Sequence, residues 1–320
     1  MKILVASTVA LLTIASTRDS AAAEYPERNL IAVVPFAAGS SNDVIARRIT
    51  PHLAKALGQQ IIVENRPGAD GRIGIEVMAK AAPDGHTMLF SGGAVALIPA
   101  LRKNVPWDPL RNIQAVAELG TIPYVVAVNP NVPAQNVAAF INLAKANPGK
   151  LNGSAGGNSS EMSIALFRIK TATRMEIIPY KGTGYAALAV ATGEADFAIM
   201  DASAWLPFLS AKKVRALAVM GARRVTAMPD VPTLREAGLP NYESGAQFGI
   251  FTTGGTPINA VRRLNSEINR IISTPEVSKS FIAIGMEPGG MTMEGFHKRY
   301  LADLAMWKDV VTRAKIPMTD

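Results

Sequence analysis

Short apolar segments alternate with amphipathic segments in the first third of the chain, and this alternation limits its fold more than any other feature. Apolar runs at residues 30–34, 60–64 and 87–90 have the length and composition of buried strands. Apolar residues at helical spacing fill the intervals, at residues 44–57 behind a Ser/Asn cap and at residues 73–82. Pro51 is expected to kink or split the first helix. The alternation predicts a parallel, doubly wound α/β sheet with ligand-binding groups at the carboxyl ends of the strands.

The same pattern returns further along the chain. Strand-like runs at residues 122–128, 175–179, 197–200 and 215–220 alternate with helical stretches at residues 137–146, 162–171 and 185–191. A strand at residues 248–252 precedes three helices, at residues 260–272, 275–284 and 293–314, whose apolar stripes need a sheet to cover. The chain of 320 residues is long enough for two domains. Because the late helices need a sheet to cover, they are predicted to return to the sheet of the first domain.

These segments predict two α/β lobes. Lobe 1 is discontinuous and comprises residues 24–121 and 247–320, whereas lobe 2 comprises residues 122–246. Two crossing segments, near residues 122–129 and 246–252, are expected to join the lobes. A cleft between two such lobes is a common site for a small ligand.

The first 23 residues have the pattern of a secretory signal peptide. Lys2 precedes an apolar run at residues 3–14, and the small residues at 21–23 offer a cleavage site after Ala23. The run is shorter than the roughly 18 apolar residues of a membrane-spanning helix. Export to the periplasm is therefore predicted. The sequence contains no cysteine, which excludes a lipid anchor on an N-terminal cysteine, disulfides and thiolate metal sites.

Motifs for catalysis and metal binding are missing from the sequence. His52, His86 and His297 are scattered, with no H-E-x-x-H or other paired-histidine spacing. No G-x-S-x-G motif anchors a hydrolase triad. No catalytic residue, metal ion or cofactor is therefore predicted, and the favoured interpretation is a protein that is not an enzyme.

One motif supports an alternative function. Gly182, Gly184 and Ala187 form a G-x-G-x-x-A sequence between a predicted strand and a predicted helix, and Asp201 ends the next strand 19 residues later (201 minus 182). This spacing is typical of an NAD-type dinucleotide-binding oxidoreductase. Pro179 in the first strand, the short following helix and the predicted export weaken this alternative. The other interpretation is a turn that exposes amide groups to a smaller anion.

The charge balance permits an anionic partner. Lys and Arg total 33 against 25 Asp and Glu, a net charge of +8, and removal of residues 1–23 leaves 31 minus 24, or +7. The paired basic residues, such as those at 47–48 and 223–224, are spread over both lobes with no interleaved aromatic stripe. Nucleic acid is therefore not a predicted partner.

Two loops of small residues are the best candidates for ligand binding. Residues 36–43 open the first helix, and residues 153–160 open a helix in the second lobe. Free backbone N–H groups and the positive ends of helix dipoles at such loops suit a carboxylate or a phosphate. If each lobe supplies one loop, both can close on the anion. A bulky residue in place of Gly39 or Gly156 is expected to abolish binding.

Several short blocks occur in a fixed order along nearly the whole chain after residue 23. They are YPER at 25–28, VPF at 34–36 with Gly39 and Asp43, VENRPGA at 63–69, PDG at 83–85, GSAG at 153–156, PYKG at 179–182, RALAV at 215–219, PDVPT at 229–233 and RLN at 263–265. In these blocks the chain resembles the extracytoplasmic solute receptors of tripartite tricarboxylate transporters, the Bug or TctC type. The resemblance implies an α/β, two-lobed flytrap architecture of the periplasmic-binding-protein kind, each lobe a doubly wound sheet flanked by helices.

The resemblance also implies a function. Such a receptor captures a small carboxylate-bearing molecule between its lobes and delivers it to integral-membrane transporter subunits, without chemistry of its own. We expect the mature protein to be a monomer. A ligand-sensing receptor for a signalling partner stays open as an alternative. The solute also stays open, as a dicarboxylate, an aromatic acid, an amino acid or a nicotinate-like molecule.

By resemblance, the two loops face each other across the cleft, and other strand ends line it. The ligand-binding residues implied in this way are Phe36, Ala38, Gly39, Ser40, Asp43, Ser91, Ser154, Ala155, Gly156, Asn158, Ser159, Lys181, Gly182 and Asp201. Asp43 either orders its own helix start or contacts a donor on the ligand, and the first role is favoured because a carboxylate would repel a carboxylate. Two residues depart from the family pattern: Ser40 replaces a glycine, and Met162 replaces a common histidine.

Overall fold

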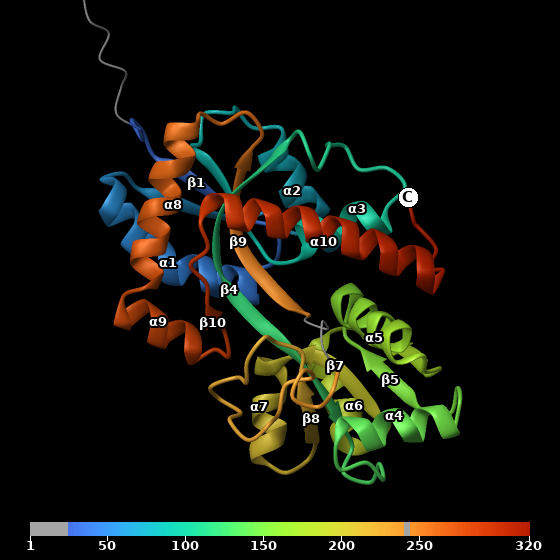
Figure 1. Cartoon of the computed structure of the whole chain (residues 1–320). Coiled ribbons are helices and arrows are strands. Elements are labelled where there is room, and N and C mark those ends of the chain that lie inside the picture. The colour runs from blue at the N-terminus through green and yellow to red at the C-terminus, as the bar shows by residue number, and fades with distance from the viewer. Residues whose placement is uncertain (1–24, 240–243) are drawn as a thin grey trace, which may run out of the picture.

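The structure is a computed structural model that describes residues 25–239 and 244–320. It consists of two lobes joined by two long, adjacent strands, β4 (Ile113–Val128) and β9 (Gly245–Thr253) (Figure 1). The predicted signal peptide and its cleavage position lie outside the described residues. None of the helices in the described ranges has the length and apolar character needed to cross a membrane.

One lobe contains both ends of the described chain. Its first part comprises β1 (Leu30–Val34), α1 (Ser41–Leu57), β2 (Ile61–Asn65), the 3₁₀ helix η1 (Ala69–Gly71), α2 (Arg72–Ala79), β3 (Thr87–Ser91) and α3 (Ala94–Leu101). After β9 the chain returns to this lobe as α8 (Ile258–Ile272), α9 (Pro275–Ile282), β10 (Glu287–Pro288) and α10 (Met293–Ala314).

The other lobe lies in the lower part of Figure 1. It comprises α4 (Val137–Ala146), β5 (Asn152–Ala155), α5 (Asn158–Thr171), β6 (Glu176–Pro179), α6 (Thr183–Thr192), β7 (Phe197–Asp201), α7 (Ala202–Ser210) and β8 (Arg215–Val219). Because β4 and β9 run through both lobes without interruption, the lobe boundaries at residues 121/122 and 246/247 stay a prediction.

A ten-stranded sheet runs through both lobes in the order β2-β1-β3-β9-β4-β7-β5-β6, with β8 and β10 paired to β4. β1 is parallel to β2 and β3, and β5 is parallel to β6 and β7, as the alternating sequence predicts. β4 and β9 are antiparallel to each other and to their outer neighbours β7 and β3. β4 is longer than the predicted run at 122–128, because residues 113–121 continue the strand beside β9.

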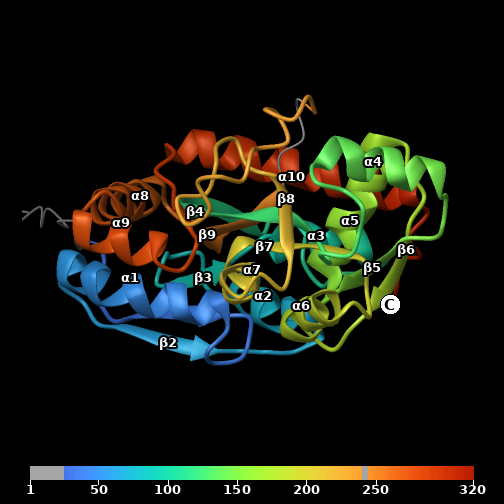
Figure 2. The same ribbon diagram turned by 90° about the horizontal axis from the view of Figure 1, so that it is seen from below.

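Helices cover both faces of the sheet, and each face has its own hydrophobic core (Figure 2). Side chains alternate between the faces along each strand. Val33 of β1 lies in the core that contains α2 and α3, whereas Val34 lies in the core that contains α1 and α8. In the second lobe, Ile199 of β7 lies in the core with α4 and α5, and Met200 in the core with α6 and α7. The predicted α/β architecture with flanking helices is confirmed.

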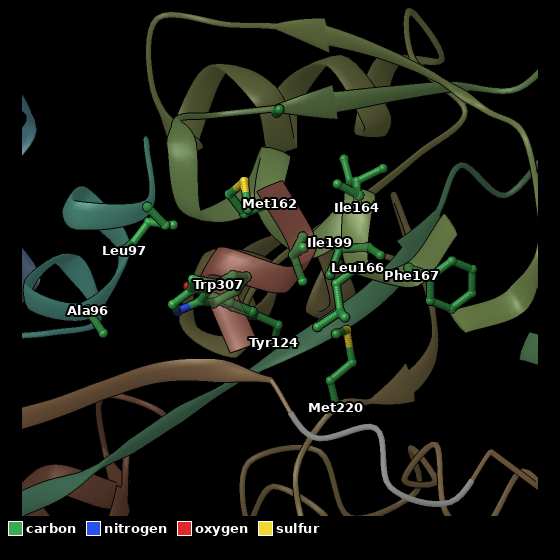
Figure 3. Packing of buried hydrophobic residues seen from close by; sticks show 14 of the residues in the cluster. Ala96, Leu97, Tyr124, Met162, Ile164, Leu166, Phe167, Ile199, Met220 and Trp307 are labelled. Carbon is green, nitrogen blue, oxygen red and sulfur yellow. The ribbon is translucent and has the colours of Figure 1, made fainter. Parts of the chain in front are cut away.

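The first of these cores continues from one lobe into the other. Figure 3 shows Leu97 of α3, Trp307 of α10, Met162 of α5 and Tyr124 of β4 in this cluster. Helix α10 of the first lobe also contacts α5 of the second. The lobes are therefore packed against each other.

Pro51 does not interrupt α1, contrary to the expectation from the sequence. The helix is continuous from Ser41 to Leu57. Proline removes the hydrogen bond to the carbonyl four residues earlier, which belongs to Arg47. Because Pro51 and Arg47 are both exposed, water can bind this carbonyl instead.

Candidate functional site

A cavity of about 250 Å³ lies between the two lobes. Loops and helix starts of both lobes border it, together with the two crossing strands. The lining residues are Phe36, Ser40, Ser41, Asn42, Gly92, Gly93, Ala94, Tyr124, Gly156, Gly157, Ser159, Ser160, Thr183, Met200, Asp201, Ala246 and Phe248.

Five helices, α1, α3, α5, α6 and α7, begin at this cavity, and each contributes a residue of its N-cap or first turn to the lining. The first N–H groups of a helix have no partner within it, and the helix dipole adds positive potential there. Among the described residues, the lining contains no Lys, Arg or His. Backbone amides, and not basic side chains, therefore make the cavity attractive to an anion.

Asp43 orders the loop that precedes α1. Its carboxylate accepts hydrogen bonds from the amide of Gly39 (2.9 Å), Nδ2 of Asn65 (3.0 Å) and Nε of Arg47 (2.9 Å). Burial alone would raise the pKa of Asp43, but these hydrogen bonds and the Arg47 charge outweigh it and hold the pKa below its ordinary value. Asp43 is outside the lining. Its contacts support the first of its two interpretations, a residue that orders its own helix start.

The loop that precedes α5 is ordered in the same way. The amide of Gly156 donates to Oγ of Ser160, four residues later (2.8 Å), and this hydroxyl donates to the carbonyl of Gly157 (3.0 Å). The amides of Gly39 and Gly156 are thus both engaged by side chains. The free amides expected at these loops lie further on, in the first turns of α1 and α5.

A third loop of this kind follows β3 and was predicted only through Ser91. The amide of Gly92 donates to Oδ1 of Asn42 (2.7 Å), which links this loop to the first turn of α1. Gly93 is the N-cap of α3 and lines the cavity together with Ala94. The sequence signal for this loop was the pair of glycines that follows Ser91, just after the strand predicted at residues 87–90.

Asp201 ends β7 and borders the cavity beside Tyr124 of β4, its partner in the sheet register. Burial raises the pKa of the Asp201 carboxyl to about 7. Burial, and then the charge of Asp201, also raise the pKa of Tyr124, while a hydrogen bond with Ser159 opposes this shift. Oδ1 of Asp201 is shielded from solvent, and no described residue donates a hydrogen bond to it. Asp201 as a whole is partly exposed at the cavity, whereas this one carboxyl oxygen lies beneath the surface without a protein partner among these residues.

The structure brings some of the predicted site residues together at the cavity: Phe36, Ser40, Gly156, Ser159 and Asp201. Ser40 is the N-cap of α1, where its side chain accepts a hydrogen bond from the amide of Asp43, so a serine suits this position. The other predicted residues lie outside the lining: Ala38, Gly39, Asp43, Ser91, Ser154, Ala155, Asn158, Lys181 and Gly182.

Some of these outside residues make structural contacts. Ser154 is fully buried, and its hydroxyl donates to a backbone carbonyl of α6 (2.8 Å). Nδ2 of Asn158 donates to Asp70 of the other lobe (3.2 Å). Lys181 is exposed. Met162, a departure from the family pattern, is buried in the core and does not line the cavity.

The lining also contains residues that were not predicted. They are Ser41, Asn42, Gly92, Gly93, Ala94, Tyr124, Gly157, Ser160, Thr183, Met200, Ala246 and Phe248. Four of them, Ser41, Asn42, Gly157 and Ser160, belong to the two predicted loops. Tyr124 and Phe248 lie on the crossing strands, where the apolar sequence gives no sign of a ligand.

Known proteins resemble this chain over most of its length. A family model described as the tripartite tricarboxylate transporter family receptor (TctC) matches residues 45–315. A solved structure of a periplasmic transporter is 34% identical, with a TM-score of 0.77 over 92% of this chain and 99% of its own. The R. palustris protein Rpa4515, solved with adipate, is 29% identical, with a TM-score of 0.77 over 92% and 99%. MatC from Rhodopseudomonas palustris, solved with bound malate, is 31% identical, with a TM-score of 0.72 over 90% and 100%.

Proposed function

Since the chain belongs to the tripartite tricarboxylate transporter receptor family, we propose that it binds a small carboxylate-bearing solute in the cavity between its lobes. The family consists of periplasmic solute receptors and not of enzymes. Two of the related structures hold adipate and malate. Both ligands are carboxylates, which supports this ligand class for the present chain.

The observation that carries the proposal is the meeting of five helix N-termini at a cavity that both lobes line. A carboxylate there accepts hydrogen bonds from the first-turn amides of α1 in one lobe and α5 in the other. Because these contacts need both lobes together, the ligand favours their packed arrangement. Asp70, which accepts from Asn158 (3.2 Å) and from Arg102 (3.4 Å), adds a contact between the lobes.

We assign the ligand contacts to lining residues of the three ordered loops. The first turns of α1, α3 and α5 supply amides, and Ser159 also supplies a hydroxyl group. Phe36 offers an apolar surface to the carbon skeleton of the solute. Gly39 and Asp43, which lie outside the lining, act on binding through the loop that they order.

We also propose how the chain is processed, where it is located and which partner it has. The signal peptide is cleaved after Ala23, and the mature chain is a monomer in the periplasm without a lipid anchor. It delivers its solute to integral-membrane transporter subunits. Membership of a family named for a transporter supports this partner over a sensory one.

The dinucleotide alternative has less support. β6, which precedes the glycine motif, lies at the edge of the sheet with mostly exposed residues, whereas the first strand of a dinucleotide-binding unit lies in the middle of its sheet. Gly182 is the N-cap of α6, and the next residue, Thr183, lines the cavity. In this position the motif presents amides to the same anion as α1 and α5.

A panel of carboxylic acids tests this function through the melting temperature. A ligand that binds only the folded chain stabilises it, by about 2.7 kcal/mol at a concentration of 100 times its Kd, which corresponds to a rise of roughly 4 °C for a chain of this size. We expect such a rise with at least one mono-, di- or aromatic carboxylate and none with NAD. The opposite result would favour the dinucleotide-binding alternative.

A further inference from the structure

A groove between α3 and α10 lies on the first lobe, and within the described residues it shares no lining residue with the cavity between the lobes. We call it the α3–α10 groove. Its volume is about 560 Å³, within the roughly 300–1,000 Å³ of sites that hold small ligands. The two helices lie side by side (Figure 1). Ala96 and Ala100 of α3 and Leu301, Ala305 and Lys308 of α10 line it at the spacing of one helix face. The three alanines are too small to fill the space between the helices.

Apolar side chains of the groove are exposed to solvent. Leu110, Leu301 and Met318 line it and are exposed by 64%, 38% and 40%. The segment that carries Met318 is tied to the chain beyond α3, because the amide of Lys103 donates to the carbonyl of Thr319 (2.9 Å). Exposed apolar side chains that gather in one place are typical of a binding surface.

The charged side chains that line the groove, among the described residues, are all basic: Arg102, Lys103 and Lys308. Arg102 is already engaged by Asp70 (3.4 Å) and by the main-chain oxygen of Asp320 (2.7 Å). Lys103 lies 3.5 Å from Oδ1 of Asp320 in an exposed ion pair, and such pairs are weak. Lys308 is exposed and forms no ion pair with any described residue. Its charge is therefore available to an anion.

We propose that the α3–α10 groove is a second binding site, for a small amphipathic anion such as an alkyl carboxylate. The alkyl chain lies between the two helices, against Leu301 and Met318, and the carboxylate contacts Lys308. This inference goes beyond the proposed function. The solute in the cleft binds backbone amides at helix starts, whereas the anion in the groove binds a lysine side chain and apolar walls.

The chemistry of the groove favours this ligand class over other small molecules. A polar anion without an alkyl chain leaves the apolar walls in water. An amphipathic cation brings its charge close to three basic side chains, with no acidic side chain in the described lining to offset them. An alkyl carboxylate satisfies both features, and each CH₂ group that is fully buried tightens binding by about fourfold.

A chain-length series tests the inference by isothermal titration. Hexanoate, octanoate and decanoate are compared at about pH 8, where carboxylates and lysines are both ionised, below the concentrations at which they form micelles. Because the groove is open on one side, we expect affinity to rise by at least about twofold for each added CH₂ group. Decyltrimethylammonium, which has the same chain length as decanoate and a positive charge, should bind at least about 10-fold more weakly than decanoate.

Two variants alter the groove without touching the cleft. A305W places an indole ring in the groove and should weaken decanoate binding by at least about 10-fold, since the ring takes the place of the alkyl chain. K308E replaces attraction by repulsion and should weaken it by at least about threefold. K55E is the control, because it changes the net charge equally at an exposed residue of α1, on the opposite face of the sheet. It should leave decanoate binding unchanged.

The possible outcomes separate the groove from the cleft. No binding of decanoate, equal affinities for wild type and A305W, or equal losses in K308E and K55E would overturn the groove site. Weaker decanoate binding in G156A but not in A305W would place decanoate in the cleft and would also overturn it. K308E and the chain-length series decide even if A305W does not fold. The proposed function stands or falls separately, because its carboxylic acids should bind A305W and wild type alike.

Discussion

Replacement of Gly156 by alanine is expected to weaken carboxylate binding by at least about 10-fold and to lower the free energy of unfolding by about 1–3 kcal/mol. A Cβ atom at Gly156 would lie 2.4 Å from Cα and 2.5 Å from N of Thr183. Because these are backbone atoms, no side-chain rotation relieves the overlap. The start of α6 must move away from the loop of α5, and both helices present their first turns to the cavity. Urea unfolding and isothermal titration measure the two effects.

Two other glycines provide matched controls. A Cβ at Gly184, one residue after Thr183, meets no atom within 4 Å, so G184A should leave affinity unchanged and raise stability by up to about 1 kcal/mol. Gly39 also has open space but a φ of +81°, so G39A should cost about 1 kcal/mol of strain and retain binding. The sequence analysis predicts the same loss of binding for a bulky residue at Gly39 and at Gly156. In the structure the two positions differ, because a Cβ atom would overlap backbone atoms only at Gly156. Equal affinities for G156A and G184A would contradict this account.

The unliganded protein is expected to lose stability as the pH rises from about 4 to about 7, because of Asp201. Burial raises the pKa of this carboxyl from 3.8 to about 7. The folded chain therefore keeps the proton in a range where the unfolded chain has released it. The contribution of this group is complete below about pH 4 and is lost as the pH rises through 7.

The difference between the wild-type chain and D201N isolates this contribution. Asp43 and Asp84 have lowered pKa values, so their contributions are present above pH 4 and are lost as the pH falls. The contributions of these two residues are the same in the wild type and in D201N, so they cancel when the free energies of unfolding of the two proteins are subtracted. Urea unfolding at several pH values should show that the wild type loses stability relative to D201N between about pH 4 and pH 7. A difference that does not change with pH would show that the Asp201 carboxyl is not shielded.

Most of the fold could be predicted because its helices and strands have regular apolar spacing. α4 and α10 have the predicted bounds, and the apolar stripe of α8 does pack on the sheet, where Asn265 of the same helix donates to the carbonyl of Val116 in β4 (2.8 Å). α3 and α7 were missed because each contains a proline and neither has a clear polar face. β5 was missed because its residues, NGSA, are small and have low strand propensity.

The candidate site could be located by its loops but not resolved into its lining residues. Gly/Ser loops at helix starts are visible in the sequence, and the carboxyl ends of parallel strands bring them to one edge of the sheet. Which side chains face the cavity depends on the sheet order and on hydrogen bonds within the loops. Tyr124 reaches the cavity only because β4 pairs with β7, next to Asp201. Asp201 was singled out both by the spacing of a dinucleotide motif and, through the family resemblance, as a strand-end residue of the cleft, and in the structure it borders the cavity at the end of β7.

A crystal structure of the protein with its tightest-binding acid tests the central claim most directly. We predict that the carboxylate occupies the cavity between the lobes, with its oxygens about 3 Å from amides in the first turns of α1 and α5. The α3–α10 groove is lined by apolar residues such as Leu304 and by three basic residues, Arg102, Lys103 and Lys308. An acid bound there or elsewhere, with only water in the cavity between the lobes, would contradict the account.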